Sequence, residues 1–176
     1  MKKIFLALFG LTLAFPFGAS ADDRELLVVG EMIEINAKPE VVWNIVKAFD
    51  GLVNWHSAFS GSPLVKGRNG HPGAVRALTI KDGPTFTEEL LAYSEARMVY
   101  TYNIVESPTA IDHYQSSMSV KGNGSGGTTV AWIGTFTRKN PRDNVPEAES
   151  DAAMVKLIIG AYQAGLQTVK TIAEGK

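Results

Sequence analysis

The chain has 176 residues, with 17 Lys and Arg against 18 Asp and Glu, and a formal net charge of −1 at pH 7. This balance offers no basic surface that would attract nucleic acid. Cysteine is absent, which excludes disulfides, a thiol nucleophile, a thiolate metal site and a lipid-attachment cysteine. The length is enough for one domain with a sizeable core.

Residues 1–21 have the pattern of a secretory signal peptide. Two lysines precede an apolar run over residues 4–17, and the tripeptide Ala-Ser-Ala ends at Ala21, before two aspartates. The run is short and contains Gly and Pro, which disfavours a permanent anchor. We therefore expect cleavage after Ala21, a periplasmic location and no stable membrane insertion afterwards. The remaining domain, residues 22–176, keeps 15 basic and 18 acidic residues, a formal net charge of −3, so nucleic acid is not an expected partner.

The mature chain opens with a strand pattern and then two short helix patterns. Residues 25–35 alternate and are rich in Leu, Val and Ile, which predicts the first strand. Pro39 then begins a segment in which Val42, Trp43 and Val46 share one helical face. A second short turn of helix is predicted near residues 52–55, so two small helices interrupt the strands.

Six further strand patterns follow, each bounded by turn-forming residues. They cover residues 62–66, 74–80, 85–93, 98–105, 111–120 and 128–137. Their sequence predicts antiparallel neighbours joined by hairpins. The Gly-rich stretch 122–127 joins two of these strands and no helix follows it, which is typical of a hairpin tip and not of a phosphate-binding loop.

A long helix is predicted over residues 144–173. Asn144 and Glu147 form a capping pattern, with Pro146 in the first turn. Apolar residues fill two adjacent rows of one face, and charged and amide side chains lie opposite. Glycine in a helix costs about 1 kcal/mol relative to alanine, so Gly160 and Gly165 require a reason. Gly165 on the apolar face leaves room either for a ligand or for close packing against a sheet. Gly160, toward the polar row, allows close packing or a bend.

Several short motifs accompany this element order: Val42-Trp43, Phe49-Asp50, Trp55-His56, residues 72–76, residues 78–83, Thr87-Glu88 and Tyr114. Together they resemble the START-related (SRPBCC) superfamily, which includes polyketide cyclases, pollen-allergen-type proteins and plant abscisic-acid receptors. Within it, the chain is most similar to the exported bacterial MxaD-like branch. The resemblance implies an α+β helix-grip fold. It has a seven-stranded curved antiparallel sheet, two short helices after strand 1, and a long C-terminal helix over a hydrophobic cavity.

The resemblance also implies which residues face that cavity. Glu88 falls on the strand position of a ligand-facing acid in the plant receptors, and Tyr114 matches a pocket tyrosine. The receptors' pocket lysine has no counterpart in the stretch Ala58–Gly61. Glu88 and its neighbour Glu89 point to opposite faces of a strand, so they do not form a catalytic pair. The other residues expected at the ligand are Trp55, His56, Arg76, Ile158, Tyr162 and Gly165.

The sequence contains no recognisable catalytic or metal-binding set. Its serines lack a nucleophile-elbow setting. His56, His71 and His113 are spread along the chain without the spacing of a metal site. We therefore expect no metal and no cofactor.

The leading hypothesis is a periplasmic binding protein for a small lipophilic molecule. Its biological output would be MxaD-like accessory action on a redox partner, a second periplasmic protein. Two alternatives stay open. One is a cyclase, dehydratase or hydrolase-like enzyme that uses Glu88, His56 or Tyr114 for proton transfer in the same cavity. The other is a ligand-free protein-interaction module with a collapsed core.

Overall fold

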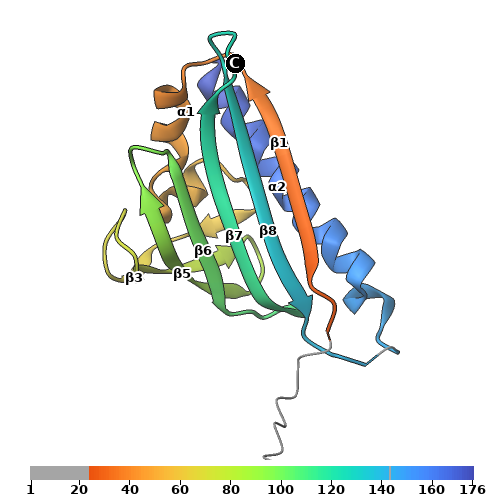
Figure 1. Ribbon diagram of the computed structural model, residues 1–176. Coiled ribbons are helices and arrows are strands. Elements are labelled where there is room, and N and C mark those ends of the chain that lie inside the picture. The colour runs from red at the N-terminus through yellow and green to blue at the C-terminus, as the bar shows by residue number, and fades with distance from the viewer. Residues whose placement is uncertain (1–23, 143) are drawn as a thin grey trace, which may run out of the picture.

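The computed structural model describes residues 24–142 and 144–176, so the predicted signal peptide lies outside the described part (Figure 1). Within that part, an eight-stranded antiparallel sheet curves against a long C-terminal helix. The elements are β1 (Leu27–Ile35), α1 (Pro39–Val46), η1 (Phe49–Asn54), β2 (Phe59–Gly61), β3 (Leu64–Lys66), β4 (Val75–Ile80), β5 (Thr85–Ser94), β6 (Val99–Glu106), β7 (Ile111–Gly122), β8 (Thr128–Arg138), η2 (Glu147–Glu149) and α2 (Asp151–Ala173).

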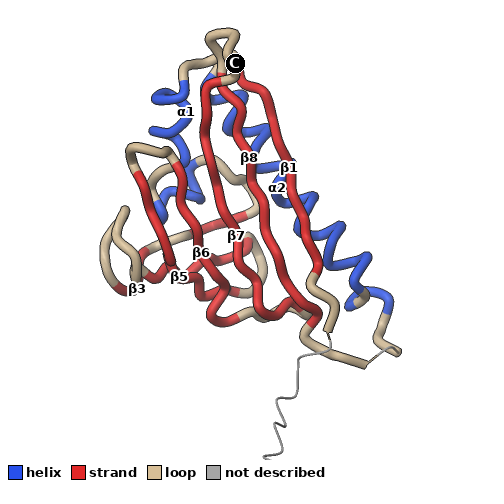
Figure 2. The backbone as a smooth tube through the Cα atoms, viewed as in Figure 1, coloured by secondary structure: helices blue, strands red, loops and turns tan. Residues whose placement is uncertain are grey.

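The strand order explains why two helices follow the first strand. The order is β1-β8-β7-β6-β5-β4-β2, with β3 also paired to β4. The first strand pairs with the last, Leu27 opposite Phe136 and Ile35 opposite Thr128, while β2 lies at the far edge. The segment containing α1 and η1 therefore carries the chain across one face of the sheet, where α2 also packs (Figure 2). This is the predicted α+β helix-grip arrangement.

The sheet has eight strands where seven were expected, because the segment near residues 59–66 forms two short strands. Pro63 separates them; it has no N–H to donate and so interrupts the ladder. Ser62 is tied to η1 instead, since its Oγ donates to the carbonyl oxygen of Asp50 at 2.5 Å and accepts from Val53 N at 3.3 Å. These bonds bend the chain between β2 and β3.

The long helix begins later than its capping pattern predicted. Residues 147–149 form the separate 3-10 turn η2, and Pro146 before it has extended backbone with φ −53° and ψ 141°. The cap is Ser150, whose side chain accepts a hydrogen bond from Ala153 N at 3.2 Å. Asp151 in the first turn adds a favourable charge at the helix N-terminus. The expected start at Asn144 is therefore wrong by about two turns.

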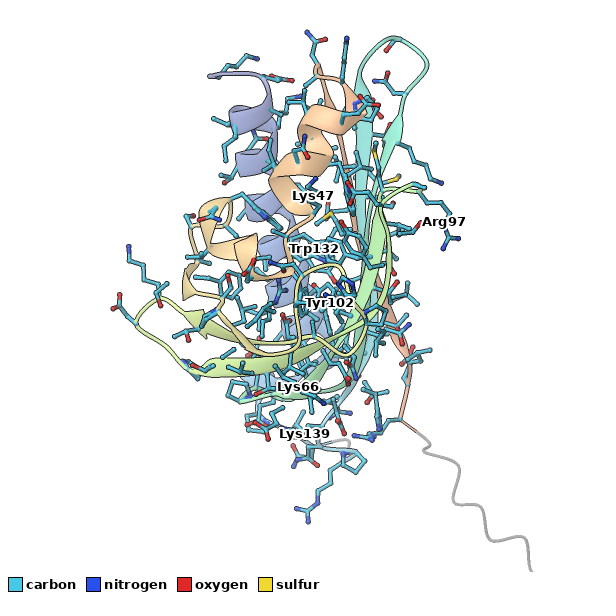
Figure 3. The ribbon with its side chains drawn as sticks, turned by 90° about the vertical axis from the view of Figure 1, so that its left-hand side faces the viewer. Lys47, Lys66, Arg97, Tyr102, Trp132 and Lys139 are labelled. Atoms are coloured by element: carbon cyan, nitrogen blue, oxygen red, sulfur yellow. The ribbon has the colours of Figure 1, made fainter. Side chains whose placement is uncertain are left out.

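Aromatic side chains fill the space between the sheet and α2. Figure 3 shows Tyr102 and Trp132 between the curved sheet and the helices, whereas Arg97 and Lys139 lie at the periphery. The ring of Trp132 on β8 stacks on Tyr162 of α2, with centroids 4.3 Å apart and planes 10° from parallel. Within the described residues, no helix is long and apolar enough to cross a membrane.

The two helix glycines have different surroundings. A Cβ added at Gly165 would lie 2.7 Å from His56 Cδ2 and 3.1 Å from the rings of Trp132 and Trp55. Gly160 is exposed, and a Cβ there would have no atom within 4 Å. Gly165 therefore allows close approach of helix and sheet. This is the close-packing alternative of the two that the sequence offered for this residue. Neither close packing nor ligand space accounts for Gly160.

Gly165→Ala is expected to lower the free energy of unfolding by about 1–3 kcal/mol, because the added methyl group overlaps the imidazole ring of His56. Gly160→Ala is the matched control, and it is expected to raise stability by about 1 kcal/mol through helix propensity alone. Urea unfolding of both variants measures the difference. Equal stabilisation by the two substitutions would show that Gly165 is not a packing contact.

Candidate ligand-binding site

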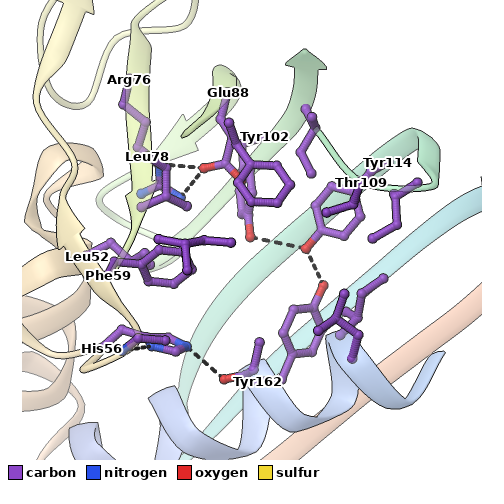
Figure 4. A pocket seen from close by; sticks show the side chains of 18 of the residues that line it. Leu52, His56, Phe59, Arg76, Leu78, Glu88, Tyr102, Thr109, Tyr114 and Tyr162 are labelled. Atoms are coloured by element: carbon purple, nitrogen blue, oxygen red, sulfur yellow. Dashed lines mark hydrogen bonds and ion pairs between the residues drawn. The ribbon is translucent and has the colours of Figure 1, made fainter. Parts of the chain in front are cut away.

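A cavity of about 240 Å³ lies between the sheet and α2 (Figure 4). Most of its wall is apolar, and it is lined by Leu52, Ala58, Phe59, Leu78, Ile80, Phe86, Ile104, Ile111, Trp132, Leu157, Ile158 and Ala161. The polar side chains in the wall are His56, Arg76, Glu88, Tyr102, Thr109, Tyr114 and Tyr162. Leu157 is 51% exposed although it lines the cavity, so the cavity opens toward solvent beside this turn of α2.

Strand alternation places the polar residues on the inner face. Arg76 on β4 is opposite Glu88 on β5, and Glu88 is opposite Ile104 on β6. Because alternate residues of a strand share a face, Leu78 and Ile104 join these side chains at the cavity, while Glu89 points to the other face. The predicted separation of the two glutamates is therefore present.

Arg76 and Glu88 form a buried ion pair at one end of the cavity. Arg76 Nε and Nη2 both lie 2.6 Å from Glu88 Oε2, and Nη1 donates to the carbonyl oxygen of Phe49 at 2.6 Å. The guanidinium group also lies over the Phe49 ring, 4.2 Å from its centroid, and 5.2 Å from that of Tyr102. Figure 4 shows both contacts converging on one carboxylate oxygen.

The ion pair fixes the charge state of both side chains. Arg76 is 1% exposed and Glu88 4% exposed. Burial raises the pKa of Glu88 above its ordinary value, and the contact with Arg76 opposes that shift. Arginine does not lose its proton in proteins, so a neutral Glu88 would leave a buried charge without a counter-ion. Glu88 is therefore an ionised acceptor at neutral pH.

A chain of hydroxyl groups crosses the cavity wall from the sheet to α2. Trp132 Nε1 donates to Tyr102 Oη at 3.1 Å, and Tyr102 Oη lies 3.3 Å from Tyr114 Oη. Tyr114 Oη lies 2.6 Å from Tyr162 Oη, which is 2.8 Å from Ser116 Oγ. Burial raises the pKa of Tyr162 to about 12 and raises those of Tyr102 and Tyr114 as well. All three hydroxyls are thus neutral at pH 7.

His56 joins the loop before β2 to the last helix. Its Nε2 lies 2.9 Å from the carbonyl oxygen of Ala161 and must donate, while Nδ1 accepts from Ala58 N at 3.3 Å. Burial lowers the pKa of His56 below 6.5, although the hydrogen bond to Ala161 opposes this shift. The ring is neutral, in one tautomer, with both nitrogens occupied. It is therefore a structural link and is not available as a general base.

The structure places six of the eight predicted ligand residues in the cavity wall and two behind it. Those in the wall are Glu88, Tyr114, His56, Arg76, Ile158 and Tyr162. Trp55 is 1% exposed and packs edge-on against Trp132, with ring centroids 5.7 Å apart. Gly165 lies against the rings of His56, Trp55 and Trp132, so these side chains fill the space that the glycine was expected to leave for a ligand.

Thirteen wall residues were not anticipated as site residues, and three of these carry hydrogen-bonding groups: Tyr102, Trp132 and Thr109. Tyr102 alternates with Tyr100 on β6, and both are buried, so the sequence pattern alone does not distinguish a cavity residue from a core residue. Among residues 24–142 and 144–176, no three His, Asp or Glu side chains come together as a metal site.

The chain belongs to the family described as polyketide cyclase/dehydrase and lipid transport, which it matches over residues 28–174. Comparison with curated proteins found no match. Among solved structures, XoxI from Bacillus cereus is 31% identical with a TM-score of 0.71, covering 83% of this chain and 94% of that one. An uncharacterised protein from Bacillus thuringiensis is 30% identical with a TM-score of 0.70, covering 83% and 98%.

The Zhui aromatase/cyclase from a Streptomyces species shares the fold, with a TM-score of 0.74 at 16% identity and coverage of 85% and 94%. The family match and the XoxI structure place the chain in the superfamily that its sequence resembles. The narrower assignment to the MxaD-like branch stays a prediction.

The buried, neutral state of His56 predicts a pH dependence of stability. The unfolded chain binds a proton near pH 6.5, whereas the folded His56 has a lowered pKa, so its contribution is present above about pH 6.5 and is lost as pH falls toward the folded value. His56→Gln, which retains an N–H donor, is expected to show a shallower loss of unfolding free energy between about pH 7.5 and about pH 5.5. His71→Gln, at an exposed histidine, is the control. Identical slopes for wild type and His56→Gln would contradict this assignment.

Proposed function

We propose that the protein binds a small lipophilic ligand in the periplasm, in the cavity between the sheet and α2. The observation that carries the proposal is the composition of this cavity. Its wall is predominantly aliphatic and aromatic, and its few polar groups already have partners within the protein. Such a wall favours a ligand whose binding is driven by burial of apolar surface.

An enzyme of the cyclase, dehydratase or hydrolase-like class is the second candidate, and the same fold in an aromatase/cyclase is what supports it. Proton transfer requires a group that is free to accept or release a proton near pH 7. His56 has both nitrogens in hydrogen bonds, Glu88 is ion-paired with Arg76, and burial raises the pKa of Tyr114. These engagements favour binding over catalysis.

The third candidate, a ligand-free interaction module with a collapsed core, fits the site less well. A collapsed core leaves few voids larger than a water molecule. The cavity of about 240 Å³ exceeds that limit and reaches solvent beside Leu157. The geometry therefore favours a binding role over a purely structural one.

Filling the cavity is the direct test of the proposed site. Ala161 lines the cavity on α2, so Ala161→Phe is expected to abolish binding of small lipophiles while leaving the melting temperature unchanged or raised. Ala164→Phe adds the same ring on the exposed face of the helix and should leave binding intact. Thermal unfolding and native mass spectrometry of material purified without detergent provide the two readouts. Equal ligand occupancy in both variants would place the ligand elsewhere.

Export and accessory action complete the proposal and depend on the leader sequence and the family resemblance. Cleavage after Ala21 is expected to yield a soluble periplasmic chain that begins at Asp22, and intact mass measured on a periplasmic extract checks this. A membrane-bound chain or a different N-terminus would contradict it.

Accessory action on a redox partner predicts co-purification with a quinoprotein alcohol dehydrogenase. Absence of this enzyme from cross-linked complexes would contradict the accessory role.

A further inference from the structure

In the row of hydroxyl groups along the cavity wall, only one assignment of donors and acceptors gives each proton an acceptor. Ser116 Oγ donates its single proton to a main-chain carbonyl oxygen at 2.9 Å. Tyr162 must therefore donate to Ser116, and Tyr114 must donate to Tyr162. Tyr102 in turn donates to Tyr114 and accepts from the indole N–H of Trp132. Every hydroxyl proton in this row is therefore donated to another group of the protein.

The other polar side chains of the inner wall also have partners within the protein, although one carboxylate oxygen has none among the described residues. His56 donates to Ala161, while Arg76 donates from Nε to Glu88 Oε2 and from Nη1 to the carbonyl oxygen of Phe49, and its Nη2 is in ion-pair contact with Oε2. Glu88 Oε2 receives both of the contacts from Arg76. Among the described residues no group donates to Glu88 Oε1, although Glu88 lines the cavity. The hydroxyl of Thr109, in the loop between β6 and β7, pairs with Ser107 Oγ at 2.9 Å.

We propose that the cavity selects uncharged lipophiles carrying one hydrogen-bond donor, a hydroxyl or N–H group, which binds Glu88 Oε1. This inference rests on the proposed function, because it specifies the ligand of the same site. A donor that reaches an ionised carboxylate in an apolar cavity makes a short and strong hydrogen bond. A lipophile without a donor leaves that oxygen buried and unpaired.

Charge excludes a second class of ligand. The positive charge of Arg76 is already balanced by Glu88 within 2.6 Å, so no unpaired cation faces the cavity from the described residues. A ligand carboxylate would meet the like charge of Glu88 and lose its hydration. Fatty acids and other lipophilic anions are therefore poor ligands, although their apolar parts suit the wall.

The cavity volume limits the size of the ligand. A protein cavity of about 150 Å³ holds benzene. The volume here, about 240 Å³, therefore fits one aromatic ring with a short alkyl chain. A para-alkylphenol combines this size with a single donor, and its hydroxyl is neutral at pH 7 because a phenol has a pKa of about 10.

Calorimetric titration of the mature protein at neutral pH with 4-propylphenol, 4-propylanisole and 4-propylbenzoate tests the proposal. The phenol is expected to bind about ten- to a hundredfold more tightly than the anisole, which lacks the donor, and the benzoate should not bind. Equal affinity for phenol and anisole, or preferred binding of benzoate, would overturn this inference while leaving the lipophile site intact. Failure of all three probes to bind would instead overturn the proposed function.

The double variant Arg76→Met, Glu88→Leu removes the acceptor without leaving a buried charge behind. It is expected to keep binding the anisole, with the advantage of the phenol reduced to about threefold or less. An unchanged preference for the phenol would place the hydroxyl elsewhere and overturn the proposal.

Tyr114→Phe tests the hydrogen-bond direction in case the double variant fails to fold. Without Tyr114 the hydroxyl of Tyr102 loses its acceptor and becomes a free donor in the wall. The ketone 4-ethylacetophenone, which only accepts, should then bind about tenfold more tightly than it does to the wild type. Tyr100→Phe is the control, since Tyr100 is buried on the same strand but does not line the cavity. An unchanged ketone affinity in Tyr114→Phe would show that the direction is wrong, and the proposal with it.

Discussion

The ion pair between Arg76 and Glu88 is the interaction on which the rest of the site depends. A buried guanidinium cannot lose its proton, so its position requires an ionised carboxylate and further acceptors around it. Glu88 provides the charge at 2.6 Å, and the carbonyl oxygen of Phe49 provides the second acceptor. The pair therefore joins β4 and β5 to η1, the segment that carries the chain across the sheet. Its geometry also leaves one carboxylate oxygen of this cavity-lining residue without a donor from the described residues.

Aromatic residues connect the ion pair to the long helix through a row of hydrogen bonds. Tyr102 lies beside the guanidinium and begins the row of hydroxyls that ends at Tyr162 and Ser116. These bonds span the wall along its surface, so they fasten α2 to the sheet without filling the space between them. His56 and Gly165 perform the complementary task, because the imidazole donates to Ala161 and packs against the glycine. The helix thus packs tightly at Gly165, while the preceding turn, at Ile158 and Ala161, lines the open cavity.

Most of the fold could be predicted from the sequence, because its signals are local. Alternation defined the long strands, Pro39 marked the first helix, and the broad apolar face of residues 154–169 marked the last one. The errors arose where two local signals competed. Ser150 and Asn144 are both residue types that favour the N-cap position, and the helix begins after Ser150. The break at Pro63 similarly divided one predicted strand into two.

The inward position of Glu88 followed from strand alternation and resemblance together. The hydroxyl chain could not be predicted, since it joins residues of β6, β7 and α2 that are far apart in sequence.

The central claim is that a mostly apolar cavity selects its ligand through one oxygen of Glu88, which receives no hydrogen bond from the described residues. A crystal structure of the protein bound to 4-propylphenol tests it most directly. The account predicts the phenol oxygen about 2.5–2.7 Å from Glu88 Oε1, with the contacts between Arg76 and Oε2 retained and the propyl chain directed toward Leu157. A phenol bound with its oxygen at Thr109, or one that displaces Glu88 from Arg76, would contradict it.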